Sequence, residues 1–366
     1  MQLPENSARG RAIIVAAVAA AMVGACATRE TPKPADTTAM MSQTPAAATP
    51  SAPGMPDAEM QAVLDELAAL SGKPIETLTP AEARKQPTPT DAVKQLLVKL
   101  GKPTTPPPGV TMTTKTVAGL PANIYTPDGA GPFPIIVYYH GGGWVIANKD
   151  VYDGGARSLA IGAKAVVISA DYREAPEHKF PAAHDDAIAV YKWALANAAS
   201  IKGDPKKVAV AGESAGGNLA VATAIAARDM KLQAPVAVIS VYPIAGRDTA
   251  TASYVENAMA KPLSRAMMSW FFDKYQHGDA DGTDPRINLV SADLAGLPPV
   301  TIINAQIDPL RTDGEMLAAK IRAAGGTVDQ KTYDGVTHEF FGMGAVHSKA
   351  KDAEAYAVAA LMKAFQ

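Results

Sequence analysis

The stretch VAVAGESAGG, residues 208–217, decides the fold class of this chain. It opens on a continuous apolar run, as expected of a buried strand, and an alanine-rich helical pattern follows it. Between strand and helix stands a Gly-x-Ser-x-Gly motif centred on Ser214, which is the context of a sharp strand-to-helix turn. Gly212 and Gly216 are needed there because side chains would clash in so tight a turn. Such a motif also occurs as chance small-residue packing, but its context here predicts an exposed, nucleophilic Ser214.

Strand and helix patterns alternate along the chain around this turn. We expect strands at 110–117, 120–125, 135–139, 165–170, 208–211, 236–241 and 300–303. Helical patterns are found at 181–198, 215–228, 314–324 and 350–365. Apolar runs are typical of strands covered on both faces, and the β-α-β-α rhythm is typical of a parallel sheet. The sequence therefore predicts an α/β fold with a mostly parallel central sheet flanked by helices.

Two amphipathic helices precede the first strand. Asp57 is a suitable N-cap for the first helix, and Thr90 or Asp91 is the expected N-cap of the second. A further helix around 263–275 interrupts the alternation later in the chain. We therefore expect an N-terminal helical cap segment at 57–104 and a catalytic domain at 105–366, with a cap insertion at about 248–277.

The first 56 residues have the features of a targeting signal followed by a linker. Residues 1–25 combine a basic start with a short apolar run and small residues, which is typical of a secretory signal peptide. The tetrad Val23-Gly24-Ala25-Cys26 resembles the lipobox of bacterial lipoproteins, and the alternative is a plain signal peptide with an incidental cysteine. Residues 26–56, rich in Pro, Thr and Ala, are expected to be a disordered tether. We expect an exported protein, anchored in the outer membrane through lipidated Cys26 or periplasmic.

The composition excludes several classes of protein and site. The chain has 366 residues, 48% of them hydrophobic and 19% charged, and a formal net charge of −2. These values are typical of a globular protein and argue against disorder and against a nucleic-acid partner. A single cysteine excludes an internal disulfide framework and a cysteine-based zinc site. The six histidines show no metal-binding spacing, so we expect no metal.

A serine hydroxyl needs a base to take its proton and a carboxylate to orient that base. Asp308 follows the strand at 300–303, and His338 lies in a loop before the last helix. Asp313 competes for the acid role, but it falls in the first turn of the next helix, where the helix dipole favours an acidic residue. His347 competes for the base role, but we expect it on the surface beside the C-terminal helix. The predicted triad is Ser214, Asp308 and His338, in the chain order Ser, Asp, His.

A glycine-rich loop, His140-Gly141-Gly142-Gly143-Trp144, follows the strand at 135–139. Only glycine allows the backbone to approach a substrate so closely, although a glycine triplet can also be a merely flexible loop. We predict that the N–H groups of Gly142, Gly143 and Ala215 stabilise the oxyanion of the reaction. His140 itself is expected to be structural.

Five motifs together resemble those of the bacterial hormone-sensitive lipase family of esterases, also called family IV. They are HGGGW at 140–144, DYREAPEHKFPAA at 171–183, GESAGG at 212–217, DPLRTDG at 308–314 and the loop of His338. The resemblance extends from about Asp57 to the C-terminus. It implies an α/β-hydrolase sheet with a helical cap, hydrolysis of carboxylic esters without a cofactor, and the catalytic roles given above.

The expected activity is that of a serine carboxylesterase acting on short- to medium-chain acyl esters through an acyl-enzyme. The expected apolar walls of its pocket, unless these residues only pack the cap, are Trp144, Met267, Met268, Phe271 and Phe272. Hydrolysis of amides, polymers or antibiotic esters uses the same triad and stays open, as does ligand binding without turnover. The expected partners are a small-molecule ester and, through the lipid anchor only, a membrane.

Three glutamates depart from the pattern of that family. Glu174 replaces the usual leucine, Glu213 stands where aspartate is commonest, and Glu339 follows the histidine where glycine is usual. None of these changes removes a catalytic atom. Our hypothesis is that Glu174 and Glu339, if they lie near His338, raise the proton affinity of its imidazole and shift activity to higher pH.

Overall fold

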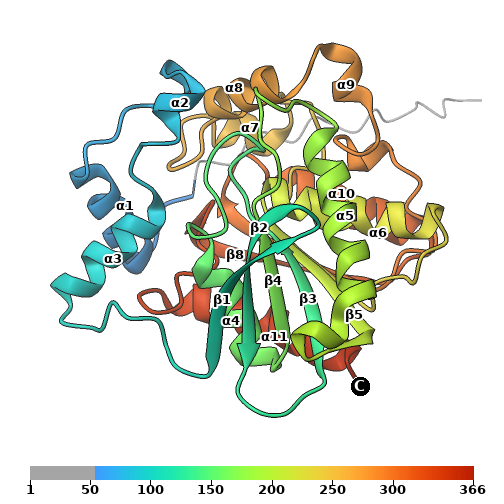
Figure 1. The fold of residues 1–366 in the computed structure, drawn as a ribbon. Coiled ribbons are helices and arrows are strands. Elements are labelled where there is room, and N and C mark those ends of the chain that lie inside the picture. The colour runs from blue at the N-terminus through green and yellow to red at the C-terminus, as the bar shows by residue number, and fades with distance from the viewer. Residues whose placement is uncertain (1–53) are drawn as a thin grey trace, which may run out of the picture. The chain divides into compact units, whose positions relative to one another are not determined.

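The computed structural model of this protein describes residues 54–366 (Figure 1). The predicted signal peptide (1–25), the predicted lipidation site Cys26 and the tether up to residue 53 lie outside the described residues. Within the described part of the chain, no helix has the length and apolar character that a membrane span needs.

Eight strands form one central sheet (Figure 1). They are β1 (Val110–Val117), β2 (Leu120–Pro127), β3 (Phe133–Tyr139), β4 (Val166–Ala170), β5 (Gly203–Glu213), β6 (Val238–Val241), β7 (Val300–Ile307) and β8 (Val328–Thr337). Their order in the sheet is β1-β2-β4-β3-β5-β6-β7-β8. β2 pairs antiparallel with β1 and with β4, whereas every pair from β4 to β8 is parallel. The predicted mostly parallel sheet is confirmed.

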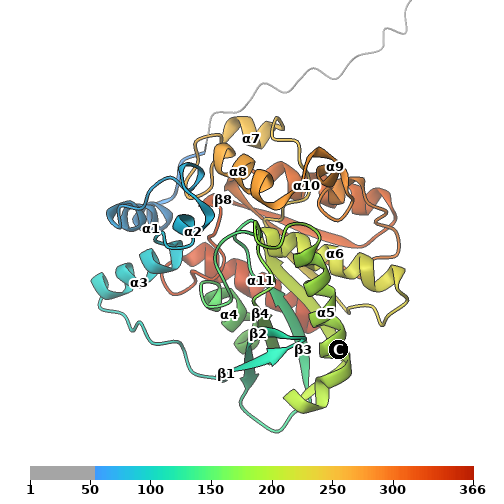
Figure 2. The same ribbon diagram turned by 45° about the horizontal axis from the view of Figure 1, so that its top comes forward.

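Helices cover both faces of this sheet (Figure 2). The α-helices are α1 (Ala58–Ala69), α2 (Pro80–Ala83), α3 (Pro89–Lys99), α4 (Asp153–Ala163), α5 (Ala182–Asn197), α6 (Ala215–Asp229), α7 (Ala252–Glu256), α8 (Arg265–Tyr275), α9 (Asp279–Thr283), α10 (Arg311–Ala323) and α11 (Ser348–Ala364). α5, α6 and α10 pack on one face, and α4 and α11 pack on the other. Along β3, Ile135 and Val137 point into the apolar layer beneath α5, α6 and α10, whereas Ile136 and Tyr138 point into the layer beneath α4 and α11. Burial on both faces explains why the central strands are apolar throughout.

The N-terminal helices and the insertion between β6 and β7 meet beside the sheet. α1 and α3 pack against each other, and α8 packs against a short 3₁₀ helix, η1 (Ile75–Thr77), that follows α1. The indole N–H of Trp270 on α8 donates to the carbonyl of Leu78 at 3.2 Å. The two segments that the sequence suggests as a cap are therefore in direct contact.

The start of α3 differs from the prediction. Neither Thr90 nor Asp91 is the N-cap, because the helix begins two residues earlier, with Thr88 as the cap and Pro89 as the first helical residue. Pro89 fits there because the first turn needs no N–H from it and its φ is already helical. Asp91 completes a capping box with Thr88, and the Thr90 hydroxyl donates instead to the carbonyl of Val151 at 2.7 Å.

Two of the longer elements have no counterpart in the predicted pattern. β8 lies at the edge of the sheet and carries exposed polar residues on one side, so it lacks the apolar run of a central strand. α4 contains three glycines, at 154, 155 and 162, which lower helix propensity. All three are needed for packing, since a Cβ at Gly154 would collide with the carbonyl of Gly342, one at Gly155 with the carboxylate of Glu213 and one at Gly162 with the side chain of Val358.

The docking of α1 on β8 generates a stability prediction. Met60 of α1 is 1% exposed, and its sulfur accepts a hydrogen bond from the Thr337 hydroxyl at 2.8 Å. We expect Met60→Ala to lower the free energy of unfolding by about 2–5 kcal/mol, because it leaves a cavity between α1 and β8. Met362→Ala is the matched control, since Met362 is 53% exposed, and its effect is expected within about 0.5 kcal/mol. Urea unfolding followed by circular dichroism measures both, and equal losses would contradict this packing.

Candidate active site

Ser214 occupies the turn between β5 and α6 with a backbone that few non-glycine residues adopt. Its φ is 57° and its ψ is −116°. A Cβ at Gly212 would collide with the carbonyl of Gly216, and one at Gly216 would collide with the carbonyl of Tyr139. Both glycines of the motif are thus fixed by close backbone contact, which leaves the serine between them at the end of β5.

The three predicted catalytic side chains meet at the carboxyl ends of β5, β7 and β8. The Ser214 hydroxyl lies 3.0 Å from Nε2 of His338, and Nδ1 of His338 lies 2.6 Å from Oδ2 of Asp308. The other carboxylate oxygen of Asp308 accepts the backbone N–H of Leu310 at 2.9 Å. Asp308 is fully buried, so its charge is directed at the imidazole. This chain of hydrogen bonds is the geometry of a serine nucleophile with a base and an orienting acid.

The two competitors for these roles lie elsewhere. Asp313 is on α10 and accepts the backbone N–H groups of Ala245 and Gly246 at 3.0 and 2.8 Å, and burial raises its pKa to about 7. His347 is not a surface residue, as expected, but is 1% exposed. It caps α11 by accepting the N–H of Ala350 through Nδ1, and its Nε2 lies 3.1 Å from Asp57. The expectation of exposure fails because the start of α1 packs over this histidine.

The charges around His338 act on its proton affinity in opposite directions. Burial lowers the pKa of the imidazole, but the charge of Asp308, its hydrogen bond and the charge of Glu339 raise it, and the net pKa is raised. Glu339 Oε1 lies 3.7 Å from Nε2 of His338. The ring of Tyr242 packs against the imidazole with 4.4 Å between centroids. The base is therefore held between two carboxylates.

Of the three predicted oxyanion donors, Gly142 and Gly143 line the cavity above Ser214, and Ala215 directly follows Ser214 in the chain. Gly142 and Gly143 have φ values of 96° and 60°, and Ala215 is the first residue of α6. Within residues 54–366, none of the three N–H groups donates to another protein group. A Cβ at Gly142 would collide with the carbonyl of Ile146, and one at Gly143 with the ring of Phe271. Free N–H groups at a helix start beside a nucleophile are suited to stabilise a negative oxygen.

His140 holds this loop from within the core. Its ring stacks on Tyr172 with 4.2 Å between centroids and an angle of 8° between the planes. The Tyr172 hydroxyl donates to the carbonyls of His140 and Gly141 at 3.0 and 3.2 Å. Burial lowers the pKa of His140, which favours its neutral form. The segment at 171–183 therefore fixes the glycine-rich loop.

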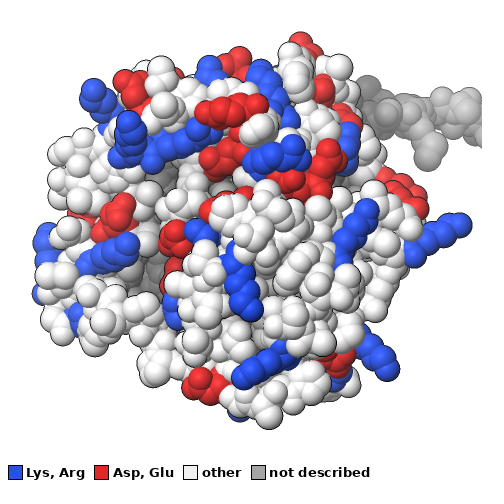
Figure 3. Space-filling view, viewed as in Figure 1, with Lys and Arg blue, Asp and Glu red and all other residues white. Residues whose placement is uncertain are grey.

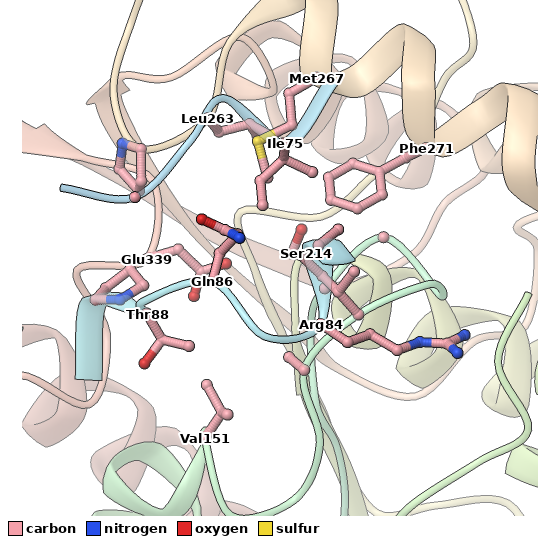
Figure 4. A pocket seen from close by; sticks show the side chains of 18 of the residues that line it. Ile75, Arg84, Gln86, Thr88, Val151, Ser214, Leu263, Met267, Phe271 and Glu339 are labelled. Atoms are coloured by element: carbon pink, nitrogen blue, oxygen red, sulfur yellow. The ribbon is translucent and has the colours of Figure 1, made fainter. Parts of the chain in front are cut away.

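A cavity of about 830 Å³ opens above Ser214 (Figure 4). Leu263, Met267 and Phe271 from the insertion form one wall. The N-terminal segment contributes the side chains of Leu64, Leu67, Ile75, Arg84, Gln86 and Thr88. The sequence places Leu64 and Leu67 on the apolar face of the first helix, but gives no sign that this face covers a cavity.

Three of the predicted wall residues do not line the cavity. Trp144 is fully buried and stacks on Tyr275 with 4.4 Å between centroids, because the turn after Gly143 directs it into the core. Met268 and Phe272 are also buried in that apolar core, since they lie on the inner face of α8. Met267 and Phe271 are the members of the predicted set that line the cavity.

Arg84 ties the N-terminal segment to the site. Its guanidinium donates to the carbonyls of Val145 and Ala175, both at 2.8 Å, and forms a two-pronged pair with Glu177 at 2.8 and 2.7 Å. This pairing lowers the pKa of Glu177 to about 2. Glu174 lies 3.3 Å from the same guanidinium, and burial raises its pKa to about 7. Glu174 therefore belongs to the group of contacts around Arg84 and makes no contact with His338. Of the two glutamates expected to raise the proton affinity of His338, only Glu339 is placed to do so.

Glu213 lies behind the turn rather than in the cavity. It is 1% exposed, and the hydroxyls of Tyr138 and Tyr242 donate to its carboxylate. Burial raises the pKa of Glu213 well above its ordinary range. No group of three or more His, Cys, Asp or Glu side chains within the described residues is placed to hold a metal ion.

Charges on the surface are mixed. On the face shown in Figure 3, acidic and basic side chains lie interspersed, most densely toward the top of the view. Several charged side chains near the cavity pair with one another, as Arg84 does with Glu177 and Lys149 with Asp171 at 3.2 Å.

Known proteins match this chain in sequence and in fold. A family model described as alpha/beta hydrolase fold matches residues 136–342. The "Carboxylesterase NlhH" of Mycobacterium tuberculosis is 37% identical over 290 residues, which are 76% of this chain and 91% of that protein. The "Ethyl acetate hydrolase" of Pseudomonas putida is 32% identical over 260 residues, 69% of this chain and 81% of that protein.

Solved structures agree with this relationship. The hyperthermophilic esterase from Pyrobaculum calidifontis superimposes with a TM-score of 0.75 at 33% sequence identity, covering 85% of this chain and 98% of that one. Together with the hydrogen-bonded Ser214, His338 and Asp308, these matches identify the family. The chain belongs to the α/β-hydrolase superfamily and, within it, to the hormone-sensitive lipase-type family IV of esterases.

Proposed function

We propose that this protein is a serine carboxylesterase that hydrolyses short- to medium-chain acyl esters through an acyl-enzyme intermediate. One observation carries the proposal: the continuous hydrogen-bonded chain from Ser214 through His338 to Asp308 at the base of an open cavity. The relatives named as carboxylesterases and as an ethyl acetate hydrolase support an ester as the substrate. A complete triad has no physical purpose in a protein that only binds its ligand.

In the first step His338 takes the proton of Ser214, and the hydroxyl oxygen attacks the ester carbonyl. Asp308 stabilises the resulting imidazolium and keeps Nε2 directed at the serine. The N–H groups of Gly142, Gly143 and Ala215 stabilise the oxyanion. The imidazolium then protonates the alcohol as it leaves, and Ser214 remains acylated.

In the second step water hydrolyses the acyl-enzyme. His338 takes a proton from the water as its oxygen attacks the acyl carbon, and it returns a proton to Ser214 when the acid leaves. The two steps thus form the same imidazolium beside the same carboxylates.

The walls and the volume of the cavity are compatible with the proposed chain length. Leu64, Leu67, Ile75, Met267 and Phe271 give it apolar sides that favour an aliphatic acyl chain. Its volume of about 830 Å³ is that of a site for a small molecule. The volume admits such chains, and the preference for short ones rests on the relative named as an ethyl acetate hydrolase.

Export is the second part of the proposal. A lipid anchor at Cys26, followed by the Pro-, Thr- and Ala-rich stretch at 26–56, tethers the catalytic body to the outer membrane. The support is the pattern of residues 1–26 alone.

Loss of Ser214 tests the proposed activity. We expect Ser214→Ala to lower kcat on p-nitrophenyl esters by about 10⁴-fold or more, because the nucleophile is removed while the fold is kept. Initial rates on an acetyl-to-palmitoyl series should peak at the short end for the unchanged protein. Ser200→Ala, at an exposed serine, is the matched control and should retain full activity. A Ser214→Ala variant with normal turnover would contradict the proposal.

The pH dependence of the reaction follows from the raised pKa of His338. Catalysis needs the neutral imidazole, so a raised pKa moves the acid limb of kcat/KM to higher pH, above the ordinary value of about 6.5. We expect Glu339→Gln to move that limb to lower pH, since it removes a negative charge near Nε2. Asp65→Asn, at an exposed position of α1, should leave the limb in place. An acid limb at or below pH ~6.5 in the unchanged protein would contradict this assignment.

Lipidation is testable in a bacterial host. We expect the full chain to incorporate labelled palmitate and to fractionate with membranes, and both properties to be lost in Cys26→Ser, because the thiol is the attachment point. Globomycin should block processing of the unchanged chain only. A soluble, unlabelled product from the unchanged chain would show that the signal peptide is of the plain type.

A further inference from the structure

Glu339 directly follows the base of the triad and lies in the wall of the cavity. Its Oε1 is 3.7 Å from Nε2 of His338, the nitrogen that exchanges protons with Ser214 at 3.0 Å. Figure 4 shows Glu339 and Ser214 lining the same cavity. The carboxylate therefore faces the side of the imidazole on which the reaction occurs, opposite to Asp308 on Nδ1.

The position of this carboxylate is fixed by two features. The hydroxyl of Tyr152 donates to Oε1 at 2.7 Å. The backbone φ of Glu339 is 70°, in the left-handed region that favours glycine over a residue with a long side chain. A strained residue at a reactive centre indicates that the surrounding structure holds it there for its side chain.

Three other carboxylates of the cavity wall are paired with basic side chains. Glu174 and Glu177 share Arg84, and Asp171 pairs with Lys149 at 3.2 Å. Among the described residues, Glu339 and Asp308 are the carboxylates within 4.0 Å of a His338 nitrogen. Only Glu339 is on the side of Nε2, where the attacking molecule must bind.

Hydrolysis of the acyl-enzyme makes a demand that acylation does not. Once Ser214 is esterified, Nε2 must accept a hydrogen bond from a water molecule. That water has a second hydrogen, and its orientation is undefined unless another acceptor takes it. Oε1 of Glu339 retains acceptor capacity beside the hydroxyl of Tyr152, since a carboxylate oxygen has two lone pairs.

We propose that Glu339 binds and orients the water that hydrolyses the acyl-enzyme, an inference that rests on the proposed esterase function. One water hydrogen bonds to Nε2 and the other to Oε1 of Glu339. The water oxygen attacks the acyl carbon, and the first proton moves to Nε2. The tetrahedral intermediate then collapses as Ser214 leaves with that proton, and the second hydrogen remains in the carboxylic acid product. Electrons and protons balance without any further reactant.

An alcohol provides the contrast that tests this role. Methanol has one hydroxyl hydrogen, which Nε2 takes, so it needs no second acceptor. Loss of the carboxylate should therefore slow attack by water more than attack by methanol. A carboxylate that only stabilises the imidazolium would slow both nucleophiles alike, because both form the same imidazolium.

The experiment measures the ratio of methyl acetate to acetate formed from p-nitrophenyl acetate by the full chain in buffered methanol–water mixtures. Glu339→Met keeps the bulk of the side chain and removes the acceptor. We expect it to raise the ratio about tenfold or more, the usual effect of losing a hydrogen bond to a charged group. Glu339→Gln, which keeps an acceptor oxygen, should fall between it and the unchanged protein. Asp65→Asn, which alters an exposed carboxylate of α1 outside the cavity wall, should keep the unchanged ratio.

Glu339→Gly guards against a folding defect, since glycine accepts a φ of 70° without strain. It should raise the ratio as Glu339→Met does. An unchanged ratio in both variants, with a normal burst of p-nitrophenol, would overturn the role of Glu339 and leave the esterase proposal intact. A raised ratio in Glu339→Gly alone would also overturn it, because room for methanol would then be the cause. Absence of both burst and turnover in the unchanged protein would instead contradict the proposed function.

Discussion

The backbone of Ser214 is the constraint on which the other catalytic distances depend. Its φ of 57° and ψ of −116° cost on the order of 1–3 kcal/mol, and the fold must hold them in place. It does so with backbone contacts that only Gly212 and Gly216 permit, and with a hydrogen bond from the Ser214 N–H to the carbonyl of Val241 at 2.9 Å. The hydroxyl then reaches His338 from β5, while the N–H of Ala215 stays free at the start of α6. One strained turn thus sets both the nucleophile and part of the oxyanion site.

The chemistry of the site also depends on the buried carboxyl groups that surround the imidazole of His338. Asp308, Glu339 and Glu213 lie at or behind the catalytic centre, and isolated charges there would be very unfavourable. Each receives hydrogen bonds: from the N–H of Leu310, from Tyr152, and from Tyr138 with Tyr242. Burial raises the pKa of Glu213 well above its ordinary range, which favours the neutral acid there. Asp308 and Glu339 are the two carboxyl groups that flank the nitrogens of His338, and burial raises the pKa of Glu339 as well.

The predictable part of this molecule is the part built from short-range rules. The central strands, the glycine turn and the triad follow from apolar runs and from residue types that the chemistry requires. β8 and α4 could not be predicted from the sequence because contacts with particular neighbours determine their residues. β8 is a polar edge strand, and Gly154 and Gly155 of α4 leave room for Gly342 and Glu213. The position of Trp144 could not be predicted for the same reason, because the direction of its side chain depends on the backbone turn after Gly143 and not on its being aromatic.

The N-terminal segment is the clearest case of a role that no local pattern indicates. Arg84 makes two hydrogen bonds to the backbone carbonyls of Val145 and Ala175, next to the oxyanion loop, and these hold only if α2 is docked. At the other side of the cavity, Asp57 accepts from His347, and its N–H donates to the carbonyl of Gly335, on the strand that ends just before His338. Removing one partner of a half-buried charged group leaves the other without compensation, so such contacts favour a single docked arrangement. The segment that lines one side of the cavity therefore also contacts the loops that carry the catalytic residues.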